Sequence, residues 1–311
     1  MINHAFGLFR SMPLCYPDVT QAIRLQDKHH VYTSKVNSMR LHISFSIMFS
    51  LFALFSVLSG TVHAADAQKD FIIAAYGGSS TKGVMAVKKE GKLKSVITKE
   101  NEIAVLNTLL KDKYGPGIRV VNYGAPSAQA LELLTGEYHY RKNKTWREEM
   151  ETSEAKIIIL NFAMNDARHY RFKDTEPDYI VSPVKYSEVM SKLIEIARAE
   201  GKAVIVQEPH PICGRIARVK LEPYVSSLNA VARSESVPLV PQFERIKKMD
   251  NWQALMSPDC THPSSELYKN KAQATFAVLE KSFGTQLAAY QKNMQTLDQT
   301  SVAKQSVSPQ P

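Results

Sequence analysis

Short apolar runs and longer amphipathic segments alternate along the 311-residue chain, and this alternation restricts its fold more than any other feature. Apolar runs between turn signals suit strands that are buried on both faces. The segments between them carry apolar residues at helical spacing. The pattern predicts a three-layer α/β/α sandwich around a five-stranded parallel sheet. We expect strands at Phe71–Tyr76, Ile118–Val121, Lys156–Phe162, Ala203–Val206 and Val237–Val240, and helices at 102–110, 186–200, 221–234 and 264–283.

Residues with catalytic potential directly follow three of the predicted strands. Gly77–Gly83 (GGSSTKG) follows the first strand, Asn122–Gly124 closes the second, and Ala163–Asp166 (AMND) closes the third. A late loop, Asp259–Pro263 (DCTHP), adds an acid and a base. The carboxyl ends of parallel strands meet at one edge of a sheet, where open α/β sheets bind their ligands. A serine, an exposed N–H, an amide and an Asp/His pair are what ester hydrolysis requires.

This ordered set resembles the SGNH hydrolases, the superfamily that contains the GDSL esterases and lipases. Gly77–Gly83 fits their first block, G-D-S-x-x-x-G, except that Gly78 replaces the aspartate. Their second block supplies a glycine, here Gly124, and Ala163–Asp166 fits the third, G-x-N-D, with alanine for glycine. Asp259–His262 matches the last block, D-x-x-H. The resemblance covers most of the chain after residue 70. It implies a flavodoxin-like SGNH hydrolase fold and a serine esterase.

The resemblance also assigns a role to each candidate residue. Ser79 is the expected nucleophile, His262 the general base, and Asp259 the carboxylate that holds the histidine Nδ1–H. The backbone N–H of Ser79, Gly124 and the amide of Asn165 are expected to form the oxyanion hole. Each block alone is also typical of an ordinary turn or helix cap, so the argument depends on their joint presence in this order.

The first block allows other interpretations. Ser80 becomes the nucleophile if the turn is shifted by one residue. A phosphate-binding loop is excluded, because that motif requires Gly-Lys-Ser/Thr, whereas Lys82 and Gly83 follow Ser-Thr here. Gly78 lacks the carboxylate that would stiffen the nucleophile loop. The alternative function is therefore a catalytically weak relative that binds or modifies acetylated envelope polysaccharide.

The N-terminal part carries the features of a secretory signal. Met39 is followed by an arginine, by a largely apolar stretch at Ile43–Leu58, and by Val62–Ala64, which suits a cleavage site. The apolar stretch is shorter than the roughly 20 residues that a membrane-spanning helix needs. We therefore predict a signal peptide at 39–64, cut after its last residue, and an exported protein. Residues 1–38 are interpreted as an upstream extension.

Cleavage leaves a predicted hydrolase domain at 65–294 and a tail at 295–311. The tail is rich in Gln, Ser and Thr and lacks periodic apolar residues, so it is expected to be disordered. The chain after residue 64 carries a net charge of +6 without a long basic run, which argues against nucleic-acid binding. The expected partner is a small acyl ester or an acylated glycan or lipid. We expect a monomer with no cofactor and no stable membrane insertion after cleavage.

Two cysteines, Cys213 and Cys260, remain after the signal is removed. An even number in an exported protein predicts a disulfide, and both residues lie in loops at the carboxyl side of the sheet. A zinc site that also uses His210 and His262 is the alternative, because zinc accepts two His and two Cys ligands. The spacing matches no common zinc motif, so no metal is expected.

Overall fold

A computed structural model describes residues 70–140 and 144–306 of the chain. These residues belong to one compact unit, Val62–Pro311. The predicted extension at 1–38 and signal peptide at 39–64 lie outside the described residues. In the part that is described, no helix combines the length and the apolar character needed to cross a membrane.

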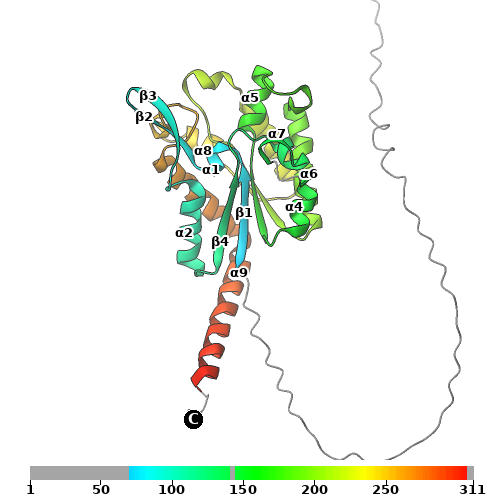
Figure 1. The fold of residues 1–311 in the computed structure, drawn as a ribbon, viewed down its shortest axis with the longest axis vertical. Coiled ribbons are helices and arrows are strands. Elements are labelled where there is room, and N and C mark those ends of the chain that lie inside the picture. The colour runs from blue at the N-terminus through cyan, green and yellow to red at the C-terminus, as the bar shows by residue number, and fades with distance from the viewer. Residues whose placement is uncertain (1–69, 141–143, 307–311) are drawn as a thin grey trace, which may run out of the picture. The chain divides into compact units, whose positions relative to one another are not determined.

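The five predicted parallel strands form one sheet (Figure 1). A separate antiparallel pair lies between the first and second of them in sequence. The strands are β1 (Phe71–Gly77), β2 (Val84–Lys89), β3 (Lys92–Ile97), β4 (Ile118–Gly124), β5 (Ile157–Asn161), β6 (Ala203–Gln207) and β7 (Leu239–Val240).

The helices between the strands include four that match the predicted segments, namely α2, α6, α7 and α9. The β2–β3 hairpin and the short helices were not predicted. The helices are α1 (Ser79–Lys82), α2 (Glu102–Tyr114), α3 (Ala130–Thr135), α4 (Trp146–Thr152), α5 (Met164–Phe172), α6 (Pro183–Ala199), α7 (Glu222–Ser234), α8 (Phe243–Lys247) and α9 (Ser265–Ser306), with 3₁₀ turns η2 (Tyr138–Tyr140), η3 (Pro177–Tyr179), η4 (Gly214–Arg218) and η5 (Trp252–Leu255).

The sheet has the strand order β4-β1-β5-β6-β7, and all its neighbouring strands run parallel. In chain order of the five strands this is 2-1-3-4-5, the flavodoxin-like order that the resemblance implied. The chain passes from β1 to β4 on one side of β1, and the next connection leads from β4 back to β5 on the other side of β1. A crevice forms at such a switch point, outside the carboxyl ends of the strands. The first and third sequence blocks follow β1 and β5, so the fold brings them to this crevice.

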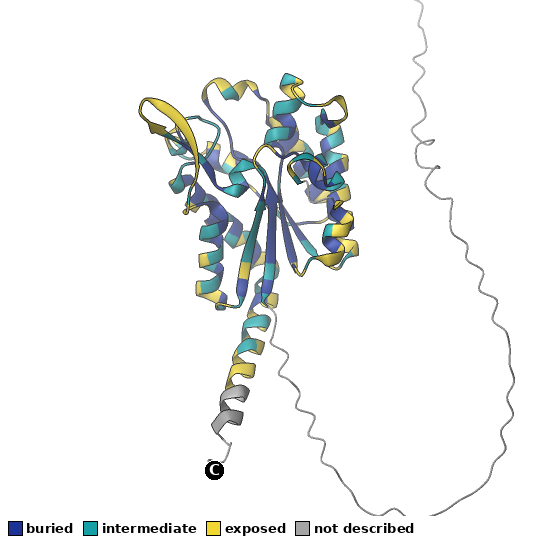
Figure 2. Cartoon of the chain, viewed as in Figure 1, coloured by how far each residue is buried: buried dark blue, intermediate teal, exposed yellow. Residues whose placement is uncertain are grey.

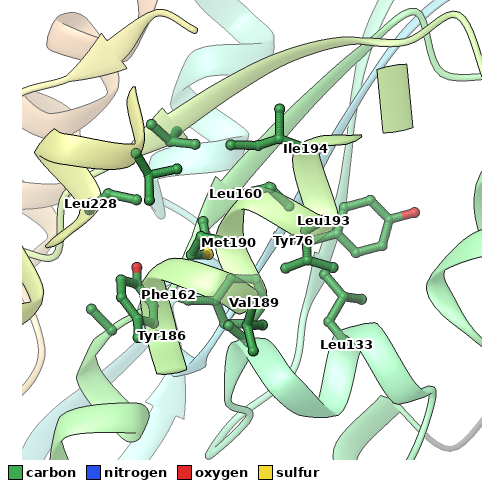
Figure 3. Packing of buried hydrophobic residues seen from close by; sticks show 14 of the residues in the cluster. Tyr76, Leu133, Leu160, Phe162, Tyr186, Val189, Met190, Leu193, Ile194 and Leu228 are labelled. Atoms are coloured by element: carbon green, nitrogen blue, oxygen red, sulfur yellow. The ribbon is translucent and has the colours of Figure 1, made fainter. Parts of the chain in front are cut away.

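Two apolar clusters cover the two faces of the sheet, as a three-layer sandwich requires. Successive side chains of a strand point to opposite faces, and β1 divides accordingly. Ile73 packs with α2 and α9, whereas Ala74 and Tyr76 pack with the helices of the other face. Figure 3 shows the second cluster, in which α6 side chains such as Leu193 lie against Leu160 of β5. Figure 2 shows that the strands of the five-stranded sheet are mostly buried, because helices cover both of its faces.

The C-terminal helix differs from the sequence prediction. α9 runs to Ser306 and so includes 295–306, which was expected to be disordered. Its first half packs against α2 and the sheet through residues such as Leu279 and Leu287. A helix that is already formed extends at little cost, and no Gly or Pro interrupts the chain between Gly284 and Ser306. The helix therefore continues beyond its packed part.

Candidate active site

The candidate nucleophile lies at the first turn after β1. Ser79 is the first residue of α1, which Gly78 precedes and Gly83 ends in a left-handed conformation, with φ of 96°. The Ser79 hydroxyl lies 2.9 Å from Nε2 of His262, although the two residues are 183 positions apart. The neighbouring Ser80 instead pairs with the buried Tyr268 side chain. The geometry therefore favours Ser79 over Ser80 as the reactive serine.

His262 joins Ser79 to a carboxylate. Its Nδ1 lies 2.6 Å from Oδ2 of Asp259. An ionised carboxylate only accepts hydrogen bonds, so Nδ1 carries the proton and the Nε2 lone pair faces the serine hydroxyl. Both side chains are mostly buried, with His262 at 15% and Asp259 at 21% of full exposure. This is the arrangement of a nucleophile, a general base and an orienting acid.

Asp259 is fixed by donors from its own loop. Its Oδ1 accepts hydrogen bonds from the Ser257 hydroxyl at 2.9 Å and from the N–H groups of Thr261 and His262, each at 3.0 Å. Burial by itself would raise the pKa of Asp259. The hydrogen bonds from His262 and Thr261 outweigh burial and hold the pKa of this carboxyl below its usual range. Asp259 therefore stays ionised beside the histidine.

Ser257 is a support that the sequence did not reveal. Its side chain is buried, donates to Asp259 and accepts from the N–H of Ala86 in β2. Its N–H also donates to the carbonyl of His262 at 2.8 Å. A serine in a loop has no distinctive pattern, so only these contacts identify its role.

The two cysteines form the predicted disulfide. Cys213 and Cys260 are bonded, with their Cα atoms 4.9 Å apart, and the N–H of Cys213 donates to the carbonyl of Cys260 at 3.0 Å. The bond fixes the middle of the loop that carries Asp259 and His262. Bonded sulfurs are not thiolates, so the alternative zinc site loses two of its four ligands.

His210, the other histidine of the zinc alternative, supports the same loop. Its Nε2 lies 2.8 Å from the carbonyl of Thr261, so Nε2 carries the proton and donates. The side chain is only 2% exposed. Burial, followed by the positive charge of Lys271, lowers the pKa of His210 to about 3. His210 is therefore a neutral donor that positions the loop.

Asn165 lines the same cavity as Ser79 and His262. Its Nδ2 donates one hydrogen bond to the carbonyl of Ala128 at 2.9 Å, which fixes the amide plane and leaves a second amide hydrogen. A Cβ atom at Gly78 would lie 2.9 Å from this Nδ2. The missing side chain at position 78 thus leaves room for the Asn165 amide beside the nucleophile.

Asp166 fixes the loop that carries Asn165. Its carboxylate is completely buried and accepts from the N–H groups of Ala163 and Ala130, each at 3.0 Å. Burial raises the pKa of Asp166 to about 6, in spite of these donors. Asp166 therefore joins the β5–α5 turn to the start of α3.

The N–H of Gly124, which the sequence analysis expected in the oxyanion hole, has another acceptor in the structure. Its N–H donates to the side-chain oxygen of Asn122 at 2.9 Å. A Cβ at this position would lie 2.3 Å from the backbone nitrogen of Lys82, so the glycine allows β4 to approach α1 closely. Gly124 also borders a different cavity, of about 290 Å³, on the side of Tyr140.

Ser127 lines the same cavity as Ser79, Asn165 and His262, and it was missed from the sequence. Its φ of 68° is a left-handed value that is uncommon for a residue with a side chain. Within residues 70–140 and 144–306, no hydrogen bond uses the N–H of Ser127 or of Ser79. The only signal in the sequence was the Pro126–Ser127 turn after the second block.

Positive φ values recur around this site. Besides Ser127, Ala163 has a φ of 101° and Cys260 a φ of 57°. Ala163 stands where the resembling family has a glycine, which adopts this conformation without strain. Residues that the fold holds in such conformations cluster at functional sites. The three loops that surround Ser79 each contain one.

A cavity of about 460 Å³ opens beside the serine. Two faces of it are mainly apolar, one from the β2–β3 hairpin and one from the segment after Cys213. Arg168 also borders it, and this arginine is paired with Asp174 at 2.6 Å. The apolar residues of the lining are Val84, Val96, Ile97, Pro126, Met164, Ile216 and Val219.

No protein-family model matches the chain, and no curated protein matches it. Several solved structures do resemble it in fold. A lipase/acylhydrolase from Enterococcus faecalis is 15% identical with a TM-score of 0.52, and the match covers 68% of this chain and 96% of that one. The chain has the SGNH hydrolase fold.

Two further structures with this fold are 16% identical to the chain, each with a TM-score of 0.51. One is a catalytic mutant of Axe2, an acetylxylan esterase from Geobacillus stearothermophilus, with 70% of this chain and 95% of that chain covered. The other is LAE5, an alpha/beta hydrolase enzyme from the metagenome of Lake Arreo, and the match covers 70% of this chain and 96% of that one. At this identity the likeness concerns the fold, so the activity is argued from the site.

Proposed function

We propose that the protein is an exported serine esterase that cleaves carboxylic esters through an acyl-serine intermediate. The observation that carries the proposal is the continuous hydrogen-bonded chain from Ser79 through His262 to Asp259. A catalytically weak glycan-binding relative would not need these three side chains in reactive geometry. Enzymes of the same fold include lipases and esterases, which agrees with this chemistry.

The reaction has two halves. Nε2 of His262 takes the hydroxyl proton as the Ser79 oxygen bonds to the ester carbonyl carbon. The tetrahedral intermediate collapses, the C–O bond to the alcohol breaks, and the alcohol leaves with the proton from His262. Water then gives a proton to His262 as its oxygen bonds to the acyl carbon, the bond from that carbon to the Ser79 oxygen breaks, and Ser79 takes the proton back from His262 as the carboxylic acid leaves. Asp259 stabilises the imidazolium that forms in each half.

For the oxyanion hole we propose the N–H groups of Ser79 and Ser127 and the free amide hydrogen of Asn165. This set replaces Gly124, whose N–H already donates to Asn122. Replacing Asn165 by alanine is expected to lower kcat by about 100- to 1,000-fold, because one oxyanion donor is worth about 3 kcal/mol.

The Ser127 donor is tested by exchanging residue 127 for its α-hydroxy analogue, which replaces the N–H by an oxygen. The same exchange at Gly124 is the matched control. We expect the exchange at residue 127 to lower kcat strongly, and the exchange at residue 124 to leave kcat within about tenfold of the wild-type value. The opposite result would return Gly124 to the oxyanion hole.

The apolar cavity supports an acyl group longer than acetyl. Each buried methylene contributes about 0.8 kcal/mol, or roughly fourfold in kcat/KM. We therefore expect kcat/KM to rise along a series of p-nitrophenyl esters from acetyl toward medium chains. A maximum at acetyl would instead indicate a deacetylase.

Export is part of the proposal because two observations support it independently. The sequence carries a signal-like segment before Ala65, and a disulfide joins Cys213 to Cys260, a bond that is rare in reducing compartments. N-terminal sequencing of the protein from the cell envelope should begin at or within a few residues of Ala65. An intact Ile43–Leu58 segment in membrane fractions would indicate an anchor.

The test of the function is labelling with a fluorophosphonate, which reacts only with an activated serine. We expect labelling of the wild type and of Ser80→Ala, and none of Ser79→Ala. Labelling of Ser79→Ala but not of Ser80→Ala would move the nucleophile by one residue. A folded wild type that neither reacts nor hydrolyses any ester would support the glycan-binding alternative.

A further inference from the structure

The β2–β3 hairpin has unusual surface chemistry. Every residue of β3 is exposed, including three large apolar side chains, with Leu93 at 53%, Val96 at 38% and Ile97 at 58% of full exposure. In the described part of the chain only three other large apolar side chains are exposed, and they lie on three different elements. Figure 2 shows the exposed hairpin standing apart from the five-stranded sheet.

Lysines surround these apolar side chains. Lys88, Lys89, Lys92 and Lys94 are all exposed, and Lys88 lies directly opposite Leu93 in the strand register. Of the four, only Lys94 has a carboxylate within 4.0 Å among the described residues, namely Glu90 of the hairpin turn. The hairpin thus presents apolar groups among cations that are largely uncompensated.

We propose that this hairpin docks the protein peripherally on the surface of an anionic phospholipid bilayer. Exposed apolar side chains gain free energy by entering the interface, and lysines gain from anionic headgroups while their aliphatic stems stay among the apolar atoms. The charge pattern complements such a surface.

Other occupants fit the hairpin less well. A second copy that pairs along β3 would bring its own lysines against Lys92 and Lys94, and like charges across a strand pair repel. An anionic polysaccharide would use the lysines but would leave Leu93 and Ile97 in water. Of these three occupants, only a lipid surface uses both kinds of side chain.

Docking would also orient the proposed active site. Val96 and Ile97 line the cavity beside Ser79, so the hairpin is one wall of its mouth. A bilayer under the hairpin would lie next to this mouth. This consequence rests on the proposed function, whereas the docking itself does not, and it is measured without any ester.

The test is co-sedimentation of the purified protein, its N-terminus checked by sequencing, with vesicles. Vesicles of equal parts phosphatidylglycerol and phosphatidylcholine are compared with vesicles of pure phosphatidylcholine. We expect binding to the former and much weaker binding to the latter. The triple variant Lys88→Gln, Lys89→Gln, Lys92→Gln should weaken binding by about 100-fold, since each lysine near the surface contributes about fivefold. Leu93→Ser should weaken it by about tenfold or more.

Two matched controls separate the hairpin from general effects. Lys192→Gln, Lys281→Gln, Lys292→Gln removes the same charge from α6 and α9, and Val184→Ser removes an apolar side chain that is 69% exposed on α6. Both should bind like the wild type. The proposal is overturned if the hairpin variants bind equally well or if binding ignores phosphatidylglycerol. A dimer that the same variants dissociate would instead assign the hairpin to contacts between copies.

Discussion

The two loops that meet at the hydrogen bond between His262 and Ser79 are held by different forces. The loop of the proposed base is held by polar and covalent bonds, with the disulfide at Cys260 and three donors on one oxygen of Asp259. The turn of the nucleophile is held by close backbone packing. A Cβ at Gly77 would lie 2.4 Å from the carbonyl oxygen of Asn161, and no side chain caps α1.

This difference suits the two chemical tasks. A base must keep its tautomer and direction, which directional hydrogen bonds provide. A serine hydroxyl must be free to lose its proton, so its position is best fixed through the backbone. We therefore expect the base loop to respond to changes in bonding and the nucleophile turn to respond to added volume.

The largest expected effect comes from breaking the contact between the two loops. Ser79→Ala and His262→Ala should each lower kcat by at least about 10⁴-fold, and the double variant should lose little more, because the two residues act as one unit. Steady-state kinetics on a p-nitrophenyl ester measures this, with circular dichroism to confirm folding. Additive losses would mean that the two residues do not act in the same step.

Removing the covalent constraint of the base loop should have the next largest effect. The paired variant Cys213→Ser, Cys260→Ser is expected to lower the free energy of unfolding by about 4 kcal/mol, the chain-entropy value for a separation of 47 residues. Urea unfolding measures the loss, and kcat should also fall because His262 is held less firmly. Reduction of the wild type serves as the control. An unchanged free energy of unfolding would show that the disulfide does not help to hold this loop.

Added volume tests the nucleophile turn. Gly124→Ala places a methyl group against the backbone of Lys82, which cannot move as a flexible side chain would. Overpacking of this kind costs about 1–3 kcal/mol and should displace α1 and lower kcat. The control is Gly201→Ala, where a Cβ would meet nothing within 4 Å and only the positive φ opposes the change. Equal activity of Gly124→Ala and the wild type would contradict packing as the force that holds this turn.

The smallest effect concerns pH and the base loop. The pKa of His210 falls from 6.5 to about 3 on folding, so unfolded chains bind a proton in this range and folded chains do not. Its contribution to stability is present above pH 6.5 and is lost as the pH falls toward 3, by about 1.4 kcal/mol per pH unit. His210→Gln keeps a donor for the Thr261 carbonyl but does not titrate.

Urea unfolding of both proteins at several pH values measures this contribution. The stability advantage of the wild type over His210→Gln should shrink by about 2 kcal/mol between pH 6.5 and pH 5. Parallel pH profiles of the two proteins would contradict the burial of a neutral His210.

Much of the architecture could be predicted from local patterns. The strands at 71–77, 118–124, 157–161 and 203–207 agree with the predicted runs to within three residues at either end. The antiparallel hairpin was missed because β3 is exposed on both faces, with lysines among its apolar residues, so it lacks the pattern of a buried strand. The end of α9 was missed because composition does not show that a packed helix precedes it.

The candidate site divides in a similar way. Ser79, Asp259, His262 and Asn165 are side chains that the motifs indicate, and the structure gathers them around one cavity or one hydrogen-bonded chain. The oxyanion donors from the backbone are different, because any residue has an N–H and only its loop conformation decides where that N–H points. Gly124 was chosen for its residue type, whereas Ser127 is proposed because it lines the cavity beside Ser79.

The sequence by itself therefore indicated the strands, the layered α/β class and the candidate reactive side chains, because periodicity and residue chemistry are local properties, whereas the strand order was implied by the family resemblance. The tertiary structure decided which N–H groups beside Ser79 have no hydrogen bond among the described residues, which serine and which histidine support the proposed base, and which apolar residues form the cavity. Several of these depend on contacts between distant segments, such as those from His210 to Thr261, 51 positions apart, and from His262 to Ser79, 183 positions apart. Only the folded chain brings such segments together.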